Sequence, residues 1–359
     1  MKGLVLSASI AALAVGVGAG VVLAQGAPQT PPRPYYTGNA LGLPIAPPAP
    51  DAQNPAPFAA MSDNVKVYGA IFSTESCTYD PDRDLIVAPA RGVGQAVRAN
   101  DAWVALINHD GSVNNARWIG VQNPGAQRDN MDPPLVLNEP FGSYIRDGIL
   151  YLADRDGGTP DPANPGQNIP GVSVVRMFNM ADGTPAGEFR VPESTGFNDL
   201  TVAEDGTIYA TQTGMALNDQ NPNAATSWRV FKITPDGTAT VFIEGEPLRQ
   251  PNGVEVDNDG NIVVVNIGNA DVLTFSPEGE LLLTEQAVQG GNDGLVILED
   301  GTKYVSSVTM GGISMIPPGG TATLIAENIP SAASMCYDAG ANQLVVPMNA
   351  NNALAFVPL

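Results

Sequence analysis

Oxygen-bearing side chains recur at one position of a repeated sequence pattern. Each copy consists of a short apolar run, a tight turn and a second apolar run. In each copy, one apolar residue anchors the second run, and we take the residue eleven positions before it. We call the six residues found in this way the ring positions. They are Glu75, Pro140, Asn198, Asn252, Asp293 and Ala333. Four of the six carry a side-chain oxygen. Two carboxylates and two amides form the hard, all-oxygen ligand set that Ca2+ prefers, whereas Zn2+ favours His or Cys.

These four residues, Glu75, Asn198, Asn252 and Asp293, are therefore predicted to bind a divalent cation, best matched by Ca2+. The alternative is that they only start strands or hold turns, as Asn and Asp often do. Two further polar residues adjoin the set in the chain, Asp199 and Asn292, and could orient a water molecule or the ligands.

A second polar set follows fourteen residues after the ring positions, where each second run ends. Its polar members are Asp154, Gln212, Asn266 and Ser307. If these run ends return to the same place as the ring positions, the four side chains would contact substrate or support the ligands. The alternative is that they are polar strand ends that face solvent.

The elements that must position these residues are strands. From residue 65 onwards no segment keeps a 3.6-residue apolar period, and Asp-Gly dipeptides separate β-branched runs. Asp-Gly suits two-residue hairpins in which both central residues have positive φ. The copies span 75–90, 140–154, 197–214, 251–268, 292–309 and 333–348. They predict an all-β fold, a six-bladed β-propeller of four-stranded blades, whose inner strands line a channel.

The two ends of the repeat region are expected to meet. A strand near Val65 to Phe72 would complete the last blade beside Ala353 to Val357, which closes the ring and leaves no open edge. Cys77 and Cys336 lie near opposite ends of this region, and either form one disulfide or are two small buried residues. The single imidazole, His109, falls in an outer hairpin turn and is predicted to be solvated.

Composition and the N-terminus restrict the protein's surroundings. The 359 residues carry a formal charge of −21, which excludes nucleic acid and anionic lipid as partners. Residues 1–24 resemble a signal peptide with an apolar run from Leu4 to Leu23, although an uncleaved anchor is the alternative. Residues 25–62 form a Pro-rich tether or strap, and 63–359 form the propeller domain. The expected location is periplasmic or secreted.

Several segments resemble the SMP-30/gluconolactonase/LRE-like family. The resemblance rests on ESCTYDPDRDLIV, FNDLTVAEDGTIYATQTG, PNGVEVDNDGNIVVVN, NDGLVILEDG and CYDAGANQLVVPMNANNALAF. It implies a six-bladed propeller with a divalent metal, usually calcium, in its channel. By this resemblance Glu75, Asn252 and Asp293 are metal ligands, Asn198 contacts substrate or metal, and Asp293 is the general base. One departure is Gly196, where members that act on sugar lactones often carry Arg.

The resulting functional hypothesis is metal-assisted hydrolysis of a small-molecule lactone or ester. The cation would polarise the carbonyl, and Asp293 or Glu75 would take a proton from water. Serine-hydrolase chemistry is disfavoured because the chain has one His and no G-x-S-x-G motif. The alternative is a non-catalytic propeller that binds a ligand or partner around a structural ion. A propeller that forms carbon–carbon or carbon–nitrogen bonds has no supporting residue.

Overall fold

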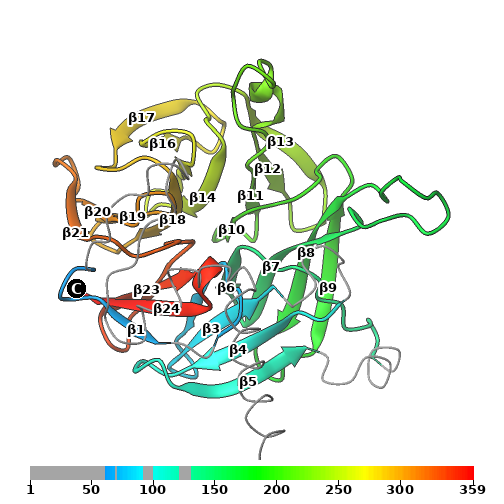
Figure 1. The fold of residues 1–359 in the computed structure, drawn as a ribbon, viewed down its shortest axis with the longest axis horizontal. Coiled ribbons are helices and arrows are strands. Elements are labelled where there is room, and N and C mark those ends of the chain that lie inside the picture. Colours follow the sequence, from blue (N-terminus) through cyan, green and yellow to red (C-terminus); the bar gives the residue numbers. More distant parts are fainter. Residues whose placement is uncertain (1–60, 69–70, 92–99, 121–130) are drawn as a thin grey trace, which may run out of the picture.

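Six antiparallel sheets of four strands surround a central channel in the computed structural model (Figure 1). The structure describes residues 61–68, 71–91, 100–120 and 131–359. The expected signal peptide (1–24) and the expected Pro-rich segment up to residue 60 lie outside the described residues. The described part of the chain contains no helix with the length and apolar character needed to cross a bilayer. The all-β, six-bladed prediction is confirmed.

Each of the first five blades is built from four consecutive strands, ordered from the channel outwards. Blades one to three comprise β2 (Thr78–Asp80), β3 (Leu85–Ala90), β4 (Trp103–Ile107) and β5 (Val113–Gly120); β6 (Ser143–Arg146), β7 (Ile149–Asp156), β8 (Val172–Asn179) and β9 (Pro185–Val191); and β10 (Leu200–Val202), β11 (Ile208–Gln212), β12 (Arg229–Ile233) and β13 (Ala239–Glu244). Blades four and five comprise β14 (Pro251–Val256), β15 (Ile262–Asn266), β16 (Asp271–Phe275) and β17 (Leu281–Gln286); and β18 (Asn292–Ile297), β19 (Lys303–Ser307), β20 (Ile313–Ile316) and β21 (Thr323–Ala326).

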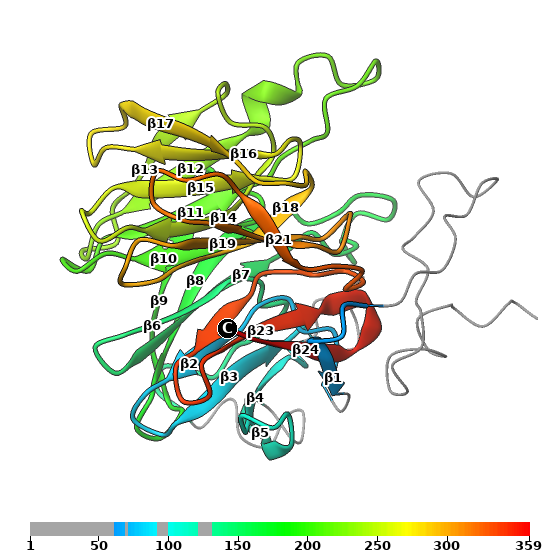
Figure 2. The same ribbon diagram turned by 90° about the vertical axis from the view of Figure 1, so that its left-hand side faces the viewer.

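The sixth blade is assembled from both ends of the described chain. Its strands are β22 (Cys336–Asp338), β23 (Gln343–Met348), β24 (Ala353–Pro358) and, outermost, β1 (Lys66–Tyr68). Val67 pairs with Ala355 in the antiparallel register of β1 and β24. This confirms the predicted closure, although β1 is shorter than the expected strand from Val65 to Phe72. Figure 2 shows the same sheets from the side, with loops and hairpin turns at the ends of their strands.

Most Asp-Gly turns have a different geometry from the one expected. In the turn between β10 and β11, Gly206 has φ of 84° whereas Asp205 does not have positive φ. The Gly206 amide donates to the Ala203 carbonyl (2.9 Å), and Asp205 Oδ1 accepts from the Thr207 amide (2.9 Å). One left-handed Gly after a type I turn therefore replaces the two-residue turn with two positive φ values. The prediction of two positive φ values is wrong for this turn, whereas Asp147 and Gly148, between β6 and β7, have φ of 51° and 73° and agree with it.

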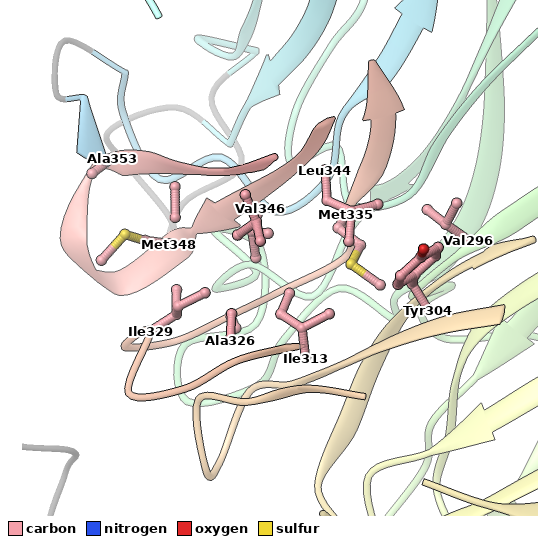
Figure 3. Close-up of a cluster of buried hydrophobic side chains, with 13 residues drawn as sticks. Val296, Tyr304, Ile313, Ala326, Ile329, Met335, Leu344, Val346, Met348 and Ala353 are labelled. Carbon is pink, nitrogen blue, oxygen red and sulfur yellow. The ribbon is translucent and has the colours of Figure 1, made fainter. Parts of the chain in front are cut away.

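Apolar side chains fill the spaces between neighbouring blades. Figure 3 shows the cluster between the fifth and sixth blades, where Val296 and Tyr304 pack with Leu344, Val346 and Met348. Alternate residues of each strand face the blade on either side, so every sheet contributes to two such clusters. This packing fixes the angle of each blade and, with it, the place where each inner strand begins.

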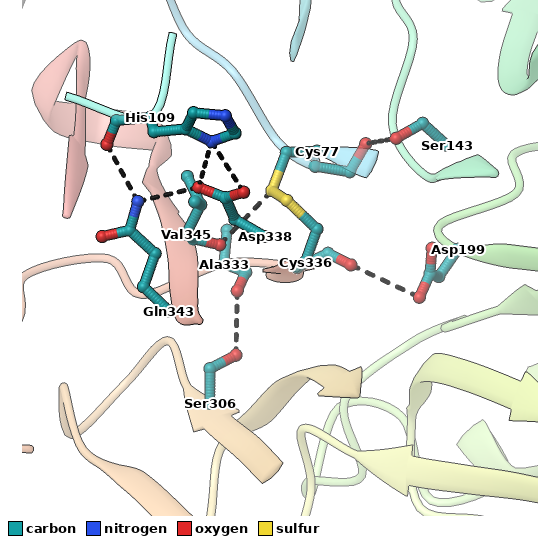
Figure 4. Close-up of a disulfide and its surroundings, with 12 residues drawn as sticks. Cys77, His109, Ser143, Asp199, Ser306, Ala333, Cys336, Asp338, Gln343 and Val345 are labelled. Carbon is teal, nitrogen blue, oxygen red and sulfur yellow. Dashed lines mark hydrogen bonds and ion pairs between the residues drawn. A yellow bond between two sulfur atoms is a disulfide. The ribbon is translucent and has the colours of Figure 1, made fainter. Parts of the chain in front are cut away.

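A disulfide joins the first and last blades at the channel. Cys77, which precedes β2, is bonded to Cys336 at the start of β22, across a sequence separation of 259 residues. Both side chains are buried, and Figure 4 shows the bond between the two inner strands. Of the two alternatives left open by the sequence, the structure contains the disulfide.

His109 lies in the turn between β4 and β5 as expected, but it is not simply solvated. Its Nδ1 lies 2.8 Å from Asp338 Oδ1, and its Nε2 lies 3.1 Å from Asp84 Oδ1. Asp338 belongs to the sixth blade and also accepts from Gln343 Nε2 (Figure 4). The prediction of a solvated turn residue is wrong, because a long-range contact places the imidazole between two carboxylates. His109 thus adds a polar link at the ring closure.

This link predicts a pH-dependent contribution to stability. The hydrogen bond to Asp338, followed by the one to Asp84, raises the pKa of His109 above its ordinary value of 6.5. The imidazolium is favoured in the folded state, so the stabilisation is fully present below about pH 6.5 and is lost as pH rises through the raised pKa. In urea unfolding, His109→Gln should therefore cost more stability at about pH 5.5 than at about pH 9. Equal losses at both pH values would contradict the assignment.

Candidate metal centre in the central channel

The oxygen-bearing ring positions lie at the starts of neighbouring inner strands. Asn252 is in β14 and Asp293 in β18, while Glu75 and Asn198 stand just before β2 and β10. Glu75, Asn252 and Asp293 are buried, with 5%, 0% and 2% of their surface exposed, and Asn198 is half-buried. Inner strands of successive blades are neighbours all round the channel. The equivalent positions of the sequence are thus equivalent in space.

A belt of hydrogen bonds between blades holds the backbone at this level. In each case a donor of one blade reaches a ring-level carbonyl of the adjacent blade. The bonds are Ser334 N to Glu75 O (3.1 Å), Ser76 Oγ to Phe141 O (2.5 Å), Gly142 N to Asn198 O (2.7 Å), Thr211 Oγ1 to Asn252 O (2.5 Å) and Ser306 Oγ to Ala333 O (2.8 Å). The Ser306 bond is visible in Figure 4. These bonds hold the main chain at the level of the ring positions, and none of them uses a side chain of a ring position.

Glycine makes this close approach of the blades possible. A Cβ at position 253 would lie 2.5 Å from the carbonyl oxygen of Asp293. A Cβ at position 294 would lie 2.5 Å from the Met335 amide nitrogen. Both glycines directly follow ring positions, so larger residues there would push neighbouring inner strands apart.

Several buried polar atoms in the set have no protein partner. They are Oδ1 and Nδ2 of Asn252, Oδ1 of Asp293 and Nδ2 of Asn292. Leaving such an atom unsatisfied costs about 1–3 kcal/mol, so clusters of them usually mark a missing ligand or water. Amide and carboxylate oxygens are the ligands of a hard cation. The residues present therefore fit a Ca2+-type ion, for which they would supply part of the shell.

The number of acidic ligands is small. Among the described residues no three His, Cys, Asp or Glu side chains are grouped to hold a metal. A cation here would depend on the Asn amides beside the carboxylates of Glu75 and Asp293. Glu75 Oε2 also accepts from Asn349 Nδ2 (2.6 Å), a contact from the connection between β23 and β24 that includes η5 (Asn349–Asn351). Water or a substrate oxygen would complete a six- to eight-oxygen shell.

Without a cation, burial and neighbouring negative charges disfavour the ionised forms of Asp293 and Asp199. Burial, then the charges of Glu75 and Asp199, raise the pKa of Asp293 well above its ordinary value. Burial likewise raises the pKa of Asp199 to about 7, although the Leu200 and Val254 amides donate to it. A bound divalent cation would reverse this balance, because it stabilises the ionised carboxylate.

The second polar set holds the chain that leads into each ring position. Gln212 Oε1 accepts from Ser194 Oγ (2.9 Å), Asn266 Oδ1 accepts from the Arg249 amide (2.9 Å), and Ser307 Oγ donates to the Gly290 carbonyl (2.7 Å). Asp154 accepts from the amides of Asn138 (3.0 Å) and Glu139 (2.6 Å). The four residues thus share one kind of contact, a hydrogen bond to the segment that precedes the ring position of the same copy. This geometry argues against direct contact with substrate, because these polar atoms are already hydrogen-bonded to other residues of the protein.

Three residues near the ring were not predicted from the sequence. The Arg91 guanidinium lies 3.5 Å from Glu75 Oε2 and 4.9 Å from the centre of the Phe141 ring. Arg155 lies 4.1 Å from the centre of the same ring. A Cβ at position 196 would be 3.1 Å from Arg155 Nη1, so Gly196 leaves room for an arginine of the preceding blade. The only sequence signal was the position of Arg155 directly after Asp154.

On the turn side of the ring, a cavity of about 1110 Å³ extends along the channel. Its lining includes Asp199, Ser334 and Glu255, and the disulfide-bonded Cys77 and Cys336. Burial, followed by the charge of Asp199, raises the pKa of Glu255 to about 8. Asp199 therefore separates the ring from a polar cavity, and both of its carboxylate oxygens bond to backbone or Ser334.

The supporting role of Asp154 predicts a large stability effect. Its carboxylate pairs with Arg176 Nε at 2.9 Å, and the two side chains are 0% and 4% exposed. Because breaking a buried pair leaves an uncompensated charge, Arg176→Met should lower the free energy of unfolding by about 3–5 kcal/mol. Arg190→Gln is the matched control, since Arg190 joins the same network from a half-exposed position. Urea titration measures both, and equal effects of the two substitutions would contradict the prediction.

One protein-family model matches part of the chain. Residues 171–346 match the model of the SMP-30/gluconolactonase/LRE-like region. This segment contains the ring positions Asn198, Asn252, Asp293 and Ala333. No curated protein sequence matches the chain.

Solved structures show the same fold at low sequence identity. A gluconolactonase from Xanthomonas campestris is 17% identical with a TM-score of 0.50, over 83% of this chain and 90% of that one. A structural-genomics target described as a candidate gluconolactonase is 16% identical with a TM-score of 0.51, over 83% and 93%. A catalytically inactive virginiamycin B lyase from Staphylococcus aureus is 14% identical with a TM-score of 0.52, over 82% and 99%.

At these identities the structural neighbours show the fold alone, and the family model shows a match over residues 171–346. The chain carries an SMP-30/gluconolactonase/LRE-like region over residues 171–346, which confirms the family resemblance of its sequence motifs.

Proposed function

We propose that the protein is an exported, Ca2+-dependent hydrolase of a small lactone or related ester. The observation that carries this proposal is the set of buried, unpartnered oxygens of Asn252 and Asp293 at the same level of the channel. The family region and the gluconolactonase-like fold support the reaction class. Glu75, Asn252 and Asp293 would hold the ion, with Asn198 as a further oxygen.

In the proposed reaction the ion and the Asp293 carboxylate have separate roles. A bound Ca2+ would polarise the substrate carbonyl and stabilise the negative charge that develops on its oxygen. Asp293 takes a proton from a water molecule as the water oxygen bonds to the carbonyl carbon. The carbon–oxygen bond of the lactone or ester then breaks, and the proton passes to the departing alkoxide oxygen. The products are a carboxylic acid and an alcohol, which in a lactone belong to one molecule.

Export is part of the proposal. The signal-like residues 1–24 support a periplasmic or secreted protein. The Cys77–Cys336 disulfide supports the same location, because such bonds persist in oxidising compartments.

Calcium removal and one substitution test the catalytic proposal. Chelator-stripped protein should hydrolyse no member of a lactone and ester panel, and Ca2+ should restore activity. Asp293→Asn should reduce kcat/KM by about 100-fold or more, because it removes the base and weakens the site. Ca2+ at 100 times its Kd should also stabilise the folded protein by about 2.7 kcal/mol in thermal unfolding. Asp300→Asn, in the exposed turn of the same blade, should leave all three properties unchanged.

Two results would overturn the proposal in different ways. Activity that persists after both chelation and Asp293→Asn would exclude metal-assisted hydrolysis at this site. Stabilisation by Ca2+ without turnover of any panel member would instead identify a non-catalytic propeller with a structural ion.

A further inference from the structure

Two arginines are held beside one aromatic ring next to the candidate metal centre. The Cζ atoms of Arg91 and Arg155 lie 4.9 Å and 4.1 Å from the centre of the Phe141 ring. The two guanidinium groups are therefore no farther apart than the sum of these distances. Arg91 also reaches Glu75, one of the oxygen-bearing ring positions, at 3.5 Å. A cationic pair thus borders the site where a substrate carbonyl would bind.

The side chains around the pair restrict its geometry. Arg91 Nε and Nη2 donate to Ser73 Oγ at 3.3 Å and 3.2 Å. Arg155 lies against Gly196, where a Cβ would come within 3.1 Å of its Nη1. The Arg91 and Arg155 side chains remain 16% and 20% exposed, so both can be reached from solvent. Partly buried, oriented guanidinium groups of this kind bind carboxylates with little loss of side-chain freedom.

Charge balance indicates what the pair requires. Arg91 is compensated by Glu75 and Arg155 by Glu139, whose Oε2 is 3.4 Å from Arg155 Nε. When Glu75 binds a divalent cation, the same carboxylate must serve both that ion and Arg91. The ion, Arg91 and Arg155 would then leave an excess of positive charge at this partly buried place, which an anion would balance. The negative charge of Glu139 stays beside Arg155 and would repel a dianion more strongly than a monoanion. The pair therefore suits a monoanionic ligand.

We infer that Arg91 and Arg155 form an anion subsite for a carboxylate of the substrate. The substrate class is then a lactone or ester that carries a carboxylate within a few bonds of the carbonyl to be hydrolysed. Phe141 holds the two guanidinium groups beside the metal centre, and Gly196 provides the space for Arg155. This inference rests on the proposed function for the identity of the scissile group, but the subsite itself can be tested by binding.

A lactam provides a probe that resembles such a lactone and resists hydrolysis. Isothermal titration calorimetry with the Ca2+-loaded protein would compare pyroglutamate, a γ-lactam carboxylate, with its neutral carboxamide. We expect pyroglutamate to bind about tenfold or more tightly than the amide. Arg155→Gln should abolish this preference, and Arg155→Lys should retain part of it. Arg117→Gln is the matched control, because Arg117 also lies over an aromatic ring, that of Trp103, but on the outer strands β4 and β5.

The outcomes separate this inference from the proposed function. Equal binding of the two lactams, binding of neither, or an equal loss for both in Arg155→Gln would overturn the subsite. Hydrolysis of γ-butyrolactone as fast as its γ-carboxylate derivative would also overturn it, while leaving the lactonase proposal intact. If the Ca2+-loaded protein hydrolyses no lactone but still prefers pyroglutamate, the subsite stands and the proposed reaction fails.

Discussion

Closure of the ring is the constraint on which the channel depends. The last blade needs β1 from the beginning of the described chain, and Cys77–Cys336 bonds the inner strands on either side of the seam. A propeller without this closure would have free strand edges and no fixed channel diameter. Glu75 stands two residues before Cys77, whereas Asn252 and Asp293 belong to the fourth and fifth blades. The seam therefore sets how closely Glu75 approaches the other oxygens.

The same close packing makes the site electrostatically demanding. Contacts between blades at Gly253 and Gly294 bring the inner strands close together at the ring, where Asn252 and Asp293 have buried atoms with no protein partner. Burial and the neighbouring carboxylates also raise the pKa of Asp293. A divalent cation would relieve both penalties at once. The ion would therefore bind tightly because it removes the cost of the unpartnered polar atoms and of the buried carboxylate charge. Arg91 and Arg155 extend the positive potential toward an anionic substrate.

Much of this arrangement follows from sequence register. Repeats with one period place equivalent residues at equivalent heights in the channel, so the sequence alone predicts that Glu75, Asn252 and Asp293 lie at one level. Features that depend on contacts between blades could not be predicted in this way. His109 contacts Asp338, which is far from it in the sequence. Arg155 contacts Phe141 and Gly196 only because the blades pack together. The geometry of the Asp-Gly turns could not be predicted either, because the same dipeptide occurs both in turns with two positive φ values and in turns where only the Gly has positive φ.

The central claim is that the ring oxygens bind a divalent cation. The most direct measurement is a crystal structure of the protein grown with Ca2+, with anomalous scattering recorded to locate the ion. We expect an anomalous peak on the channel axis, about 2.3–2.6 Å from oxygens of Glu75, Asn252 and Asp293. A well-ordered channel with no peak there, and with the side chains of Asn252 and Asp293 bonded to protein or water instead, would contradict it.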